Sequence, residues 1–289
     1  MSRNPYHVDG VEPTLRKSAF VFMDILGYSD MLRHSDSEGA QQETLRRVYK
    51  ALEDGRTWLE DGHVDVEWRE MLPKDRYALK AFTDNIVIGW PVRDDAEAEL
   101  GSAFSKLAHF QFDMVTAGFF IRGAISVGDA YVDEIAVFGG ALSEAYIGES
   151  TKARDPRIIL TESAATAVKQ HLTYYGNPSH APQTRNILRD SDGQLFLNYL
   201  DCLLIAEDEH GPFYDQLEKH KVVIEVELKK HKANPVIWSK YAWVAGYHNY
   251  FCDLYPQYFS EEHKIQVDLF RASPSLIIDF EPMQWYGDE

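Results

Sequence analysis

The sequence predicts an α+β fold in which helices cover an antiparallel-rich sheet. Three observations support this prediction. Short apolar segments rich in Val, Ile and Phe alternate with longer segments of helical periodicity. Several of the apolar segments come in pairs joined by turn residues, as in antiparallel hairpins. The chain has 289 residues, 45% of them hydrophobic, which is enough for a sizeable buried core.

The first part of the chain predicts a leader, a strand and a helix. Residues 1–17 are polar, contain two prolines and are expected to be loosely held. The segment AFVFMDIL, residues 19–26, is expected to form a buried strand. In residues 39–54, leucine and valine recur at helical spacing, which predicts an amphipathic helix.

The next part predicts a hairpin and a second helix. Two β-rich halves of residues 77–90 meet at Thr83, Asp84 and Asn85, and Asp and Asn tolerate turn dihedrals. Residues 94–118 begin with an acidic cluster, which suits the positive end of a helix dipole.

Three further segments complete the expected sheet. In residues 119–150, two strands are expected to flank a turn at 127–129, and a helix follows a glycine pair at 139–140. Residues 157–172 predict a strand and a helix, and residues 194–205 predict another strand. This order of elements is typical of a ferredoxin-like sandwich with helices on one face of the sheet.

The C-terminal part has a different character. Residues 206–289 are expected to form a helical, aromatic extension with a break at Asn234–Pro235, packed on residues 18–205 or on a partner subunit. The predicted organisation is therefore a leader at 1–17, a catalytic domain at 18–205 and this extension.

Composition excludes several classes of function. Asp and Glu number 46 against 29 Lys and Arg, a net charge of −17, which argues against nucleic-acid binding or attachment to anionic membranes. No signal peptide or membrane span is recognisable, so a cytoplasmic location is expected. Cys202 and Cys252 are expected to be buried thiols. Histidines such as His220 and His231 show no ligand spacing and are expected to be solvated.

Two carboxylates stand out because their neighbours are apolar. Asp24 lies within the first predicted strand, and Asp84 lies at the tip of the predicted hairpin. Burial of an unpaired carboxylate costs several kcal/mol, so Asp24 is expected to be neutral, paired, at a strand end or bound to a cation. If the two strands are neighbours, both carboxylates converge at one edge, where a divalent ion would relieve their repulsion.

Two basic residues accompany these carboxylates. Lys80 lies four residues before Asp84 in an extended segment, so both are expected on one face. Arg122 interrupts the apolar segment FFIRGAIS. It could neutralise a triphosphate or form a structural ion pair, and the sequence leaves both open.

Three segments together resemble the class III nucleotidyl cyclases. FMDILGYSDML is similar to the first metal-binding strand of that family, LKAFTDNIVIGW to its second metal-binding hairpin, and RGAISVGDAY followed by VFGGALSEAYIGES to the strand pair and helix that complete its site. The resemblance covers about residues 18–205.

The resemblance implies a set of site residues. Asp24, Asp84 and the Ile25 carbonyl would hold two Mg²⁺ or Mn²⁺ ions, and Arg122 would assist catalysis. The substrate, a nucleoside triphosphate, would contact the following residues: Phe22, Gly27, Tyr28, Lys80, Ser143 and Lys152. Family members place their sites between two subunits, so a homodimer is expected.

Departures from the purine cyclases indicate either an inactive relative or an enzyme that recognises another base. Ala136 and Ile147 stand where those enzymes carry an Asp that reads adenine and an Arg that stabilises the transition state, and Ser143 stands in place of an Asn. The sequences of these segments, together with the helical C-terminal extension, resemble the bacterial Pycsar pyrimidine cyclases. Those enzymes make cyclic UMP or cyclic CMP in antiphage defence, and the cyclic nucleotide activates a separate effector. UTP is the expected substrate. CTP, ATP and a catalytically dead nucleotide sensor remain alternatives.

Overall fold

The computed structural model describes residues 4–7, 10–33, 38–60, 77–204, 211–270 and 280–282. Its described strands form one sheet in the order β2-β3-β1-β4-β6-β8-β7-β9, and β5 pairs with β4. Every pairing is antiparallel except β4 with β6, which confirms the predicted antiparallel-rich α+β fold. The strands are β1 Arg16–Ile25, β2 Ala78–Phe82, β3 Asn85–Pro91, β4 Ile121–Val132, β5 Val137–Phe138, β6 Ile158–Leu160, β7 Ile187–Asp190, β8 Leu195–Leu197 and β9 Phe280–Pro282.

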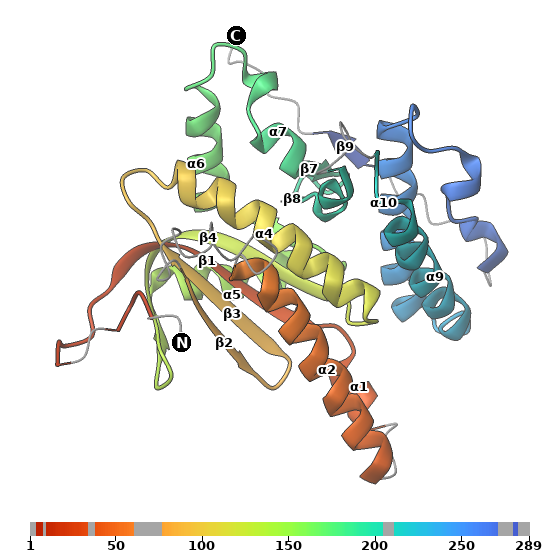
Figure 1. Ribbon diagram of the computed structural model, residues 1–289, viewed down its shortest axis with the longest axis horizontal. Helices are drawn as coiled ribbons and strands as arrows, with labels where there is room; N and C mark the ends of the chain where they lie inside the picture. Colours follow the sequence, from red (N-terminus) through yellow and green to blue (C-terminus); the bar gives the residue numbers. More distant parts are fainter. Residues whose placement is uncertain are drawn as a thin grey trace.

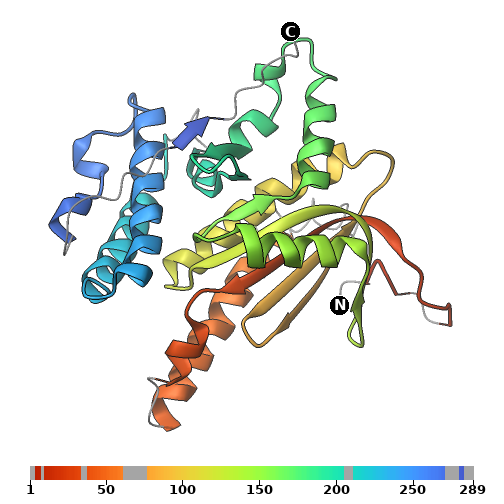
Figure 2. The same cartoon turned by 180° about the vertical axis from the view of Figure 1, so that it is seen from behind.

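Helices lie on both faces of this sheet (Figures 1 and 2). The α-helices are α1 Tyr28–Arg33, α2 Glu38–Leu59, α4 Glu97–Thr116, α5 Gly140–Lys152, α6 Glu162–Leu172, α7 Gln183–Asn186, α9 Tyr214–Lys230 and α10 Pro235–Leu254. Short 3₁₀ helices cover Pro178–His180, Tyr199–Leu204, Glu261–His263 and Val267–Phe270.

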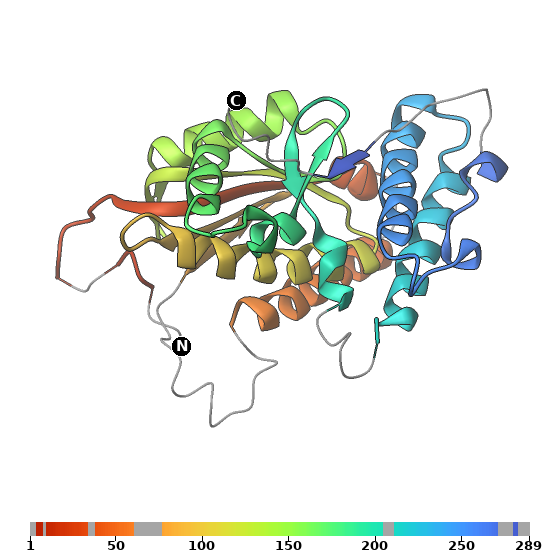
Figure 3. The same cartoon turned by 90° about the horizontal axis from the view of Figure 1, so that it is seen from above.

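The central strand β1 explains why both faces are covered. Its side chains alternate, so that Val21 and Met23 join the core beneath α4, whereas Phe20 and Phe22 join a second apolar cluster with Ala141 of α5. The prediction of helices on one face was therefore wrong. Figure 3 shows the sheet edge-on, with α4 and α5 on opposite sides.

Two local predictions were also wrong. The expected turn at 127–129 lies inside β4, which runs unbroken because β1 pairs with it from Ile121 to Ala130, Ser18 facing Gly128. The chain turns later, where Asp133 Oδ1 accepts hydrogen bonds from the amides of Ile135 at 2.8 Å and Ala136 at 2.6 Å. Of the strand expected at 194–205, whose last residue lies outside the described ranges, the structure forms a strand at Leu195–Leu197 and a 3₁₀ helix at Tyr199–Leu204.

The C-terminal helices α9 and α10 form an antiparallel pair beside the sheet (Figure 3). The predicted break between them is confirmed: the Asn234 side chain accepts a hydrogen bond from the Ile237 amide at 3.3 Å, and Pro235 opens α10. Beyond these helices, β9 pairs with β7, so the chain returns to the sheet. In the described residues, no helix is long and apolar enough to cross a bilayer.

Buried polar contacts fix α10 on the core. The Trp243 indole donates to Asp190 Oδ2 at 2.7 Å, and Asp190 also pairs with the buried Arg157. The Tyr247 hydroxyl donates to Asn198 Oδ1 at 2.7 Å. Because these groups are satisfied by residues from β7 and the segment after β8, the position of α10 is set by the core.

The thiols and histidines have contrasting outcomes. Cys202 and Cys252 are free and buried, as predicted. His220 is fully buried rather than solvated, and its ring stacks on His248 at a centroid distance of 5.2 Å. His231 is half-buried and stacks on Tyr241. The lysines that flank these histidines suggested exposure. However, α9 packs one face on the core and turns the other to solvent, so a buried histidine and exposed lysines can alternate along it.

Candidate functional site

Asp24 and Asp84 meet at the edge of the sheet where β1 ends and the β2–β3 hairpin turns. Asp24 faces Asn85 in the β1–β3 pairing. One residue on, the Ile25 amide donates to the Asp84 carbonyl at 2.9 Å. Asp84 Oδ1 accepts hydrogen bonds from Thr83 Oγ1 at 2.8 Å and Asn85 Nδ2 at 3.1 Å. The hairpin thus holds the second carboxylate beside the first.

Arg122 neutralises part of this acidic cluster. In the β1–β4 pairing it lies directly opposite Asp24, and its Nε and Nη2 atoms are each 3.2 Å from Asp24 Oδ2. Its Nε is also 2.7 Å from Oε1 of Glu149, a carboxylate of α5 that is only 4% exposed. Both sequence interpretations of Arg122 thus remain compatible with its position: it forms ion pairs, and it lies at the site.

The pKa values of these carboxylates reflect their surroundings. Burial raises the pKa of Asp24 above its ordinary value; Arg122 opposes this shift, and the nearby charge of Asp84 adds to it. Burial likewise raises the pKa of Glu149, against the effect of Arg122. Asp24 and Glu149 therefore share one guanidinium group, and Asp84 adds a further negative charge beside Asp24, a charge pattern that favours a cation.

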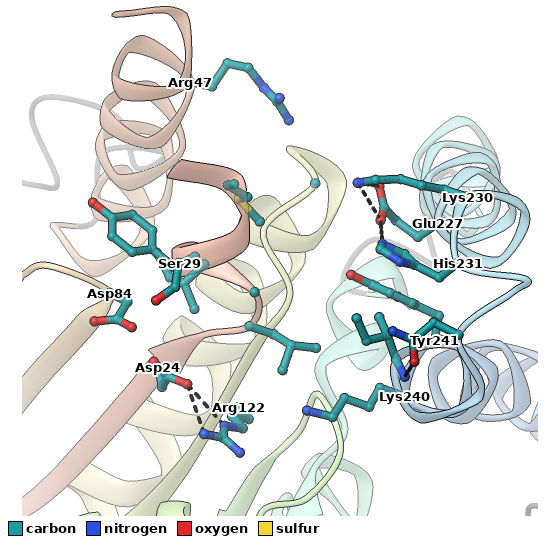
Figure 4. Close-up of a pocket in the computed structure, with 18 residues that line it drawn as sticks. Asp24, Ser29, Arg47, Asp84, Arg122, Glu227, Lys230, His231, Lys240 and Tyr241 are labelled. Carbon is teal, nitrogen blue, oxygen red and sulfur yellow. Dashed lines mark hydrogen bonds and ion pairs between the residues drawn. The ribbon is translucent and has the colours of Figure 1, made fainter. Parts of the chain in front are cut away.

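A pocket of about 860 Å³ opens from this cluster. Its volume falls within the range of about 300–1,000 Å³ that is usual for small-molecule sites. One wall comes from the sheet edge and α1, and the opposite wall comes from α9 and α10 (Figure 4). The lining residues used below are Asp24, Ile25, Gly27, Tyr28, Arg47, Asp84, Arg122, Glu227, Lys230, His231, Ile237, Lys240 and Tyr241.

The wall formed by α9 and α10 is basic. Glu227 Oε2 lies 3.2 Å from Lys230 Nζ and 3.1 Å from His231 Nε2, in the last turn of α9. Lys240 extends from α10 toward the side of the pocket that holds Arg122 (Figure 4). Burial lowers the pKa of Lys240, and the charge of Arg122 acts in the same direction. The sequence analysis missed this wall, because no pattern in residues 211–254 indicates which helix face meets Asp24.

The structure brings together only some of the residues expected at the site. Asp24, Ile25, Asp84 and Arg122 line the pocket, as do Gly27, at φ +74°, and Tyr28. Four others do not line it. Phe22 lies on the opposite face of the sheet against Tyr146, and Lys80 donates to the Glu134 carbonyl at 2.9 Å. Ser143 and the exposed Lys152 belong to α5.

The pair Asp24 and Asp84 fits a hard divalent cation by its chemistry. Carboxylate oxygens are the ligands that Mg²⁺ and Mn²⁺ prefer, and the negative charge of Asp84 adds to the burial that raises the pKa of Asp24, an effect that a bound cation would offset. Within the described ranges, no group of three or more His, Cys, Asp or Glu side chains is arranged to hold a metal by itself. Substrate oxygens or water would therefore have to complete the coordination.

Comparison with known proteins yields structural similarities only. No family model and no curated protein matches the chain. A solved class III adenylyl cyclase-like ATP-binding protein from Pseudomonas aeruginosa aligns at 17% identity and a TM-score of 0.40, covering 56% of this chain and 38% of its own. The solved guanylyl cyclase Cya2 aligns at 14% identity and a TM-score of 0.34, covering 53% of this chain and 79% of its own. Similarities this weak do not indicate a function, so the function proposed below is argued from the geometry of the site.

Proposed function

We propose that the protein is a nucleotidyl cyclase that converts UTP to 3′,5′-cyclic UMP and pyrophosphate. The observation that carries the proposal is that Asp24 and Asp84 line one pocket whose opposite wall is basic. Such an arrangement suits a substrate that combines bound divalent cations with a polyphosphate chain. The three segments that resemble the class III cyclases contain both aspartates and Arg122.

The reaction joins the ribose 3′ oxygen to the α-phosphorus and breaks the bond to pyrophosphate, and the hydroxyl proton passes to water. Two Mg²⁺ or Mn²⁺ ions, held by Asp24 and Asp84, would supply charge neutralisation at the reacting oxygens. Arg122 favours the ionised form of Asp24 against the effect of burial and orients its carboxylate through their ion pair at 3.2 Å. The basic wall faces the acidic pair and would position the phosphates that leave.

The choice of a pyrimidine base rests on two positions at which this chain lacks the residues typical of purine cyclases. Ala136 belongs to the turn between β4 and β5, and Ile147 is an exposed residue of α5, so neither offers the carboxylate or guanidinium of a purine cyclase. CTP and ATP are the alternative substrates. A nucleotide sensor without catalysis is the alternative function, favoured by the Asp24–Arg122 ion pair, which satisfies the first carboxylate without a metal.

A homodimer belongs to the same proposal. Lys80, Ser143 and Lys152 lie outside the pocket that contains Asp24 and Asp84. This position is expected if they contact the substrate bound to a second subunit. Exposed apolar side chains of the β4–β5 turn, β5 and α5 also favour association: Ile135, Phe138, Tyr146 and Ile147. In the cell, the proposed enzyme would be cytoplasmic, would act in antiphage defence and would signal to a separate effector through its cyclic nucleotide.

The test is to incubate the purified protein with each of the four NTPs and Mn²⁺ and to identify products by mass spectrometry. Formation of cyclic UMP supports the proposal. Formation of cyclic CMP or cyclic AMP instead would identify CTP or ATP as the substrate, and the absence of a product from any NTP favours the nucleotide sensor. Asp24→Asn and Asp84→Asn should each lower the rate by at least about 100-fold, the order of magnitude lost with one group that stabilises transition-state charge. Asp215→Asn, at an exposed position of α9, is the matched control. Unchanged turnover in Asp24→Asn would refute the metal assignment.

A further inference from the structure

Lys240 differs from the other basic residues that line the pocket. Arg122 pairs with Asp24, and Lys230 pairs with Glu227. Arg47 donates to the Ala117 carbonyl at 3.1 Å. Among the described residues, no carboxylate forms an ion pair with the ammonium group of Lys240. The ammonium group is half-buried, and the charges of Asp155 and Asp24 act on its pKa less than burial and Arg122 do. A polyphosphate would supply the direct anionic contact that this group lacks.

The helix face that carries Lys240 is the one that lines the pocket. Asn234, the N-cap of α10, and the helical residues Ile237, Lys240 and Tyr241 follow helical spacing, and all four line the pocket. In Figure 4 the side chains of Lys240 and Tyr241 extend from α10 toward the sheet edge, and Lys240 extends toward Arg122. The orientation of α10 thus brings a cation from residues far along the chain to the acidic pair.

Contacts on either side of Lys240 hold it there. The next residue, Tyr241, packs edge-on against Phe120 at a centroid distance of 4.9 Å, and Phe120 lies two residues before Arg122. Three residues beyond Lys240, the Trp243 indole is anchored to Asp190 of β7. A side chain whose neighbours are fixed in this way loses less entropy when it binds a ligand.

We infer that Lys240 binds the polyphosphate chain of the substrate, as the cation that α10 adds to the site formed by β1, β3 and β4. The inference rests on the proposed function, because a polyphosphate is the ligand that would link the acidic pair to this wall. The charge pattern agrees with it: cations bound at Asp24 and Asp84 would hold one side of the phosphates, and the ammonium group would contact the other. The C-terminal helices are then part of the active site.

The test uses a ligand that cannot be cyclised. Inorganic tripolyphosphate is titrated into the full-length protein in Mn²⁺ buffer by isothermal titration calorimetry, and KM for UTP is measured in parallel. Lys240→Gln should weaken tripolyphosphate binding by at least about 10-fold, as expected for loss of a charge-assisted contact, and Lys240→Arg should restore most of it. Lys229→Gln removes an exposed lysine of α9 that does not line the pocket, and it should change nothing.

The two readouts separate this inference from the proposed function. Wild-type tripolyphosphate affinity in Lys240→Gln, or no binding by the wild type, overturns the role of Lys240, whatever the cyclase assay gives. Binding that depends on Lys240 in a protein that yields no cyclic nucleotide supports the phosphate site and refutes the cyclase. A circular dichroism spectrum and an unfolding midpoint equal to those of the wild type show that Lys240→Gln is folded.

Discussion

A buried chain of hydrogen bonds between α9, α10 and the segment after β8 predicts how stability depends on pH. The His248 Nε2 atom lies 2.9 Å from the His263 carbonyl, which can only accept, so this nitrogen carries the proton. His248 Nδ1 must then accept from His220 Nδ1 at 2.9 Å, and His220 Nε2 must accept from the Tyr199 hydroxyl at 2.7 Å. Protonation of either histidine would turn its accepting nitrogen into a donor, so this arrangement of donors and acceptors would be lost.

The magnitude follows from the pKa of His248, which burial lowers from 6.5 to about 4. The folded state disfavours the charged form, so the contribution of His248 to stability is complete above pH 6.5 and is lost as pH falls toward 4. Between pH 7.5 and pH 5, one such histidine costs about 2 kcal/mol of unfolding free energy. His220, whose pKa burial also lowers, acts in the same direction.

The assay is urea unfolding followed by circular dichroism at pH 7.5 and pH 5. His248→Gln keeps an amide donor for the His263 carbonyl and removes the titrating group. The variant should be less stable at pH 7.5, and its unfolding free energy should fall by about 2 kcal/mol less than that of the wild type between the two pH values. His180→Gln, at an exposed position, is the control with unchanged behaviour. An equal pH dependence in His248→Gln and wild type would refute the reasoning.

Three further changes test the scaffold, each by urea unfolding. Gly139→Ala should destabilise by at least about 2 kcal/mol, because φ is +131° and the new Cβ would lie 2.2 Å from the Asp129 carbonyl oxygen; wild-type stability would contradict this. Asn234→Ala should cost about 1 kcal/mol through loss of the cap that accepts from Ile237; no change would show that α10 does not need it. Burial raises the pKa of Asp113 to about 6, so wild-type stability is lost as pH rises through 6. Asp113→Asn should gain about 1 kcal/mol relative to wild type between pH 5 and pH 8, after allowance for solvent screening; a constant difference would exclude the titration.

Sequence patterns predicted correctly those features that depend on residues close together in the sequence. The hairpin around Asp84, the helix with its apolar face over residues 39–54 and the helix break at Asn234 all follow from periodicity and turn chemistry within a few residues. The turn expected at 127–129 failed because pairing of β4 with β1 over ten residues outweighs a local turn preference.

The sequence by itself determined that Asp24 needs a partner, because a carboxylate within an apolar strand cannot remain charged and uncompensated. Only the tertiary structure decided which partners it has. Arg122 reaches it from β4 and is itself paired with Glu149 of α5, and Lys240 faces the same pocket from α10. The physical reason is that charges interact through space over a few ångströms, whereas the residues that carry these charges lie about 100 to 200 positions apart along the chain.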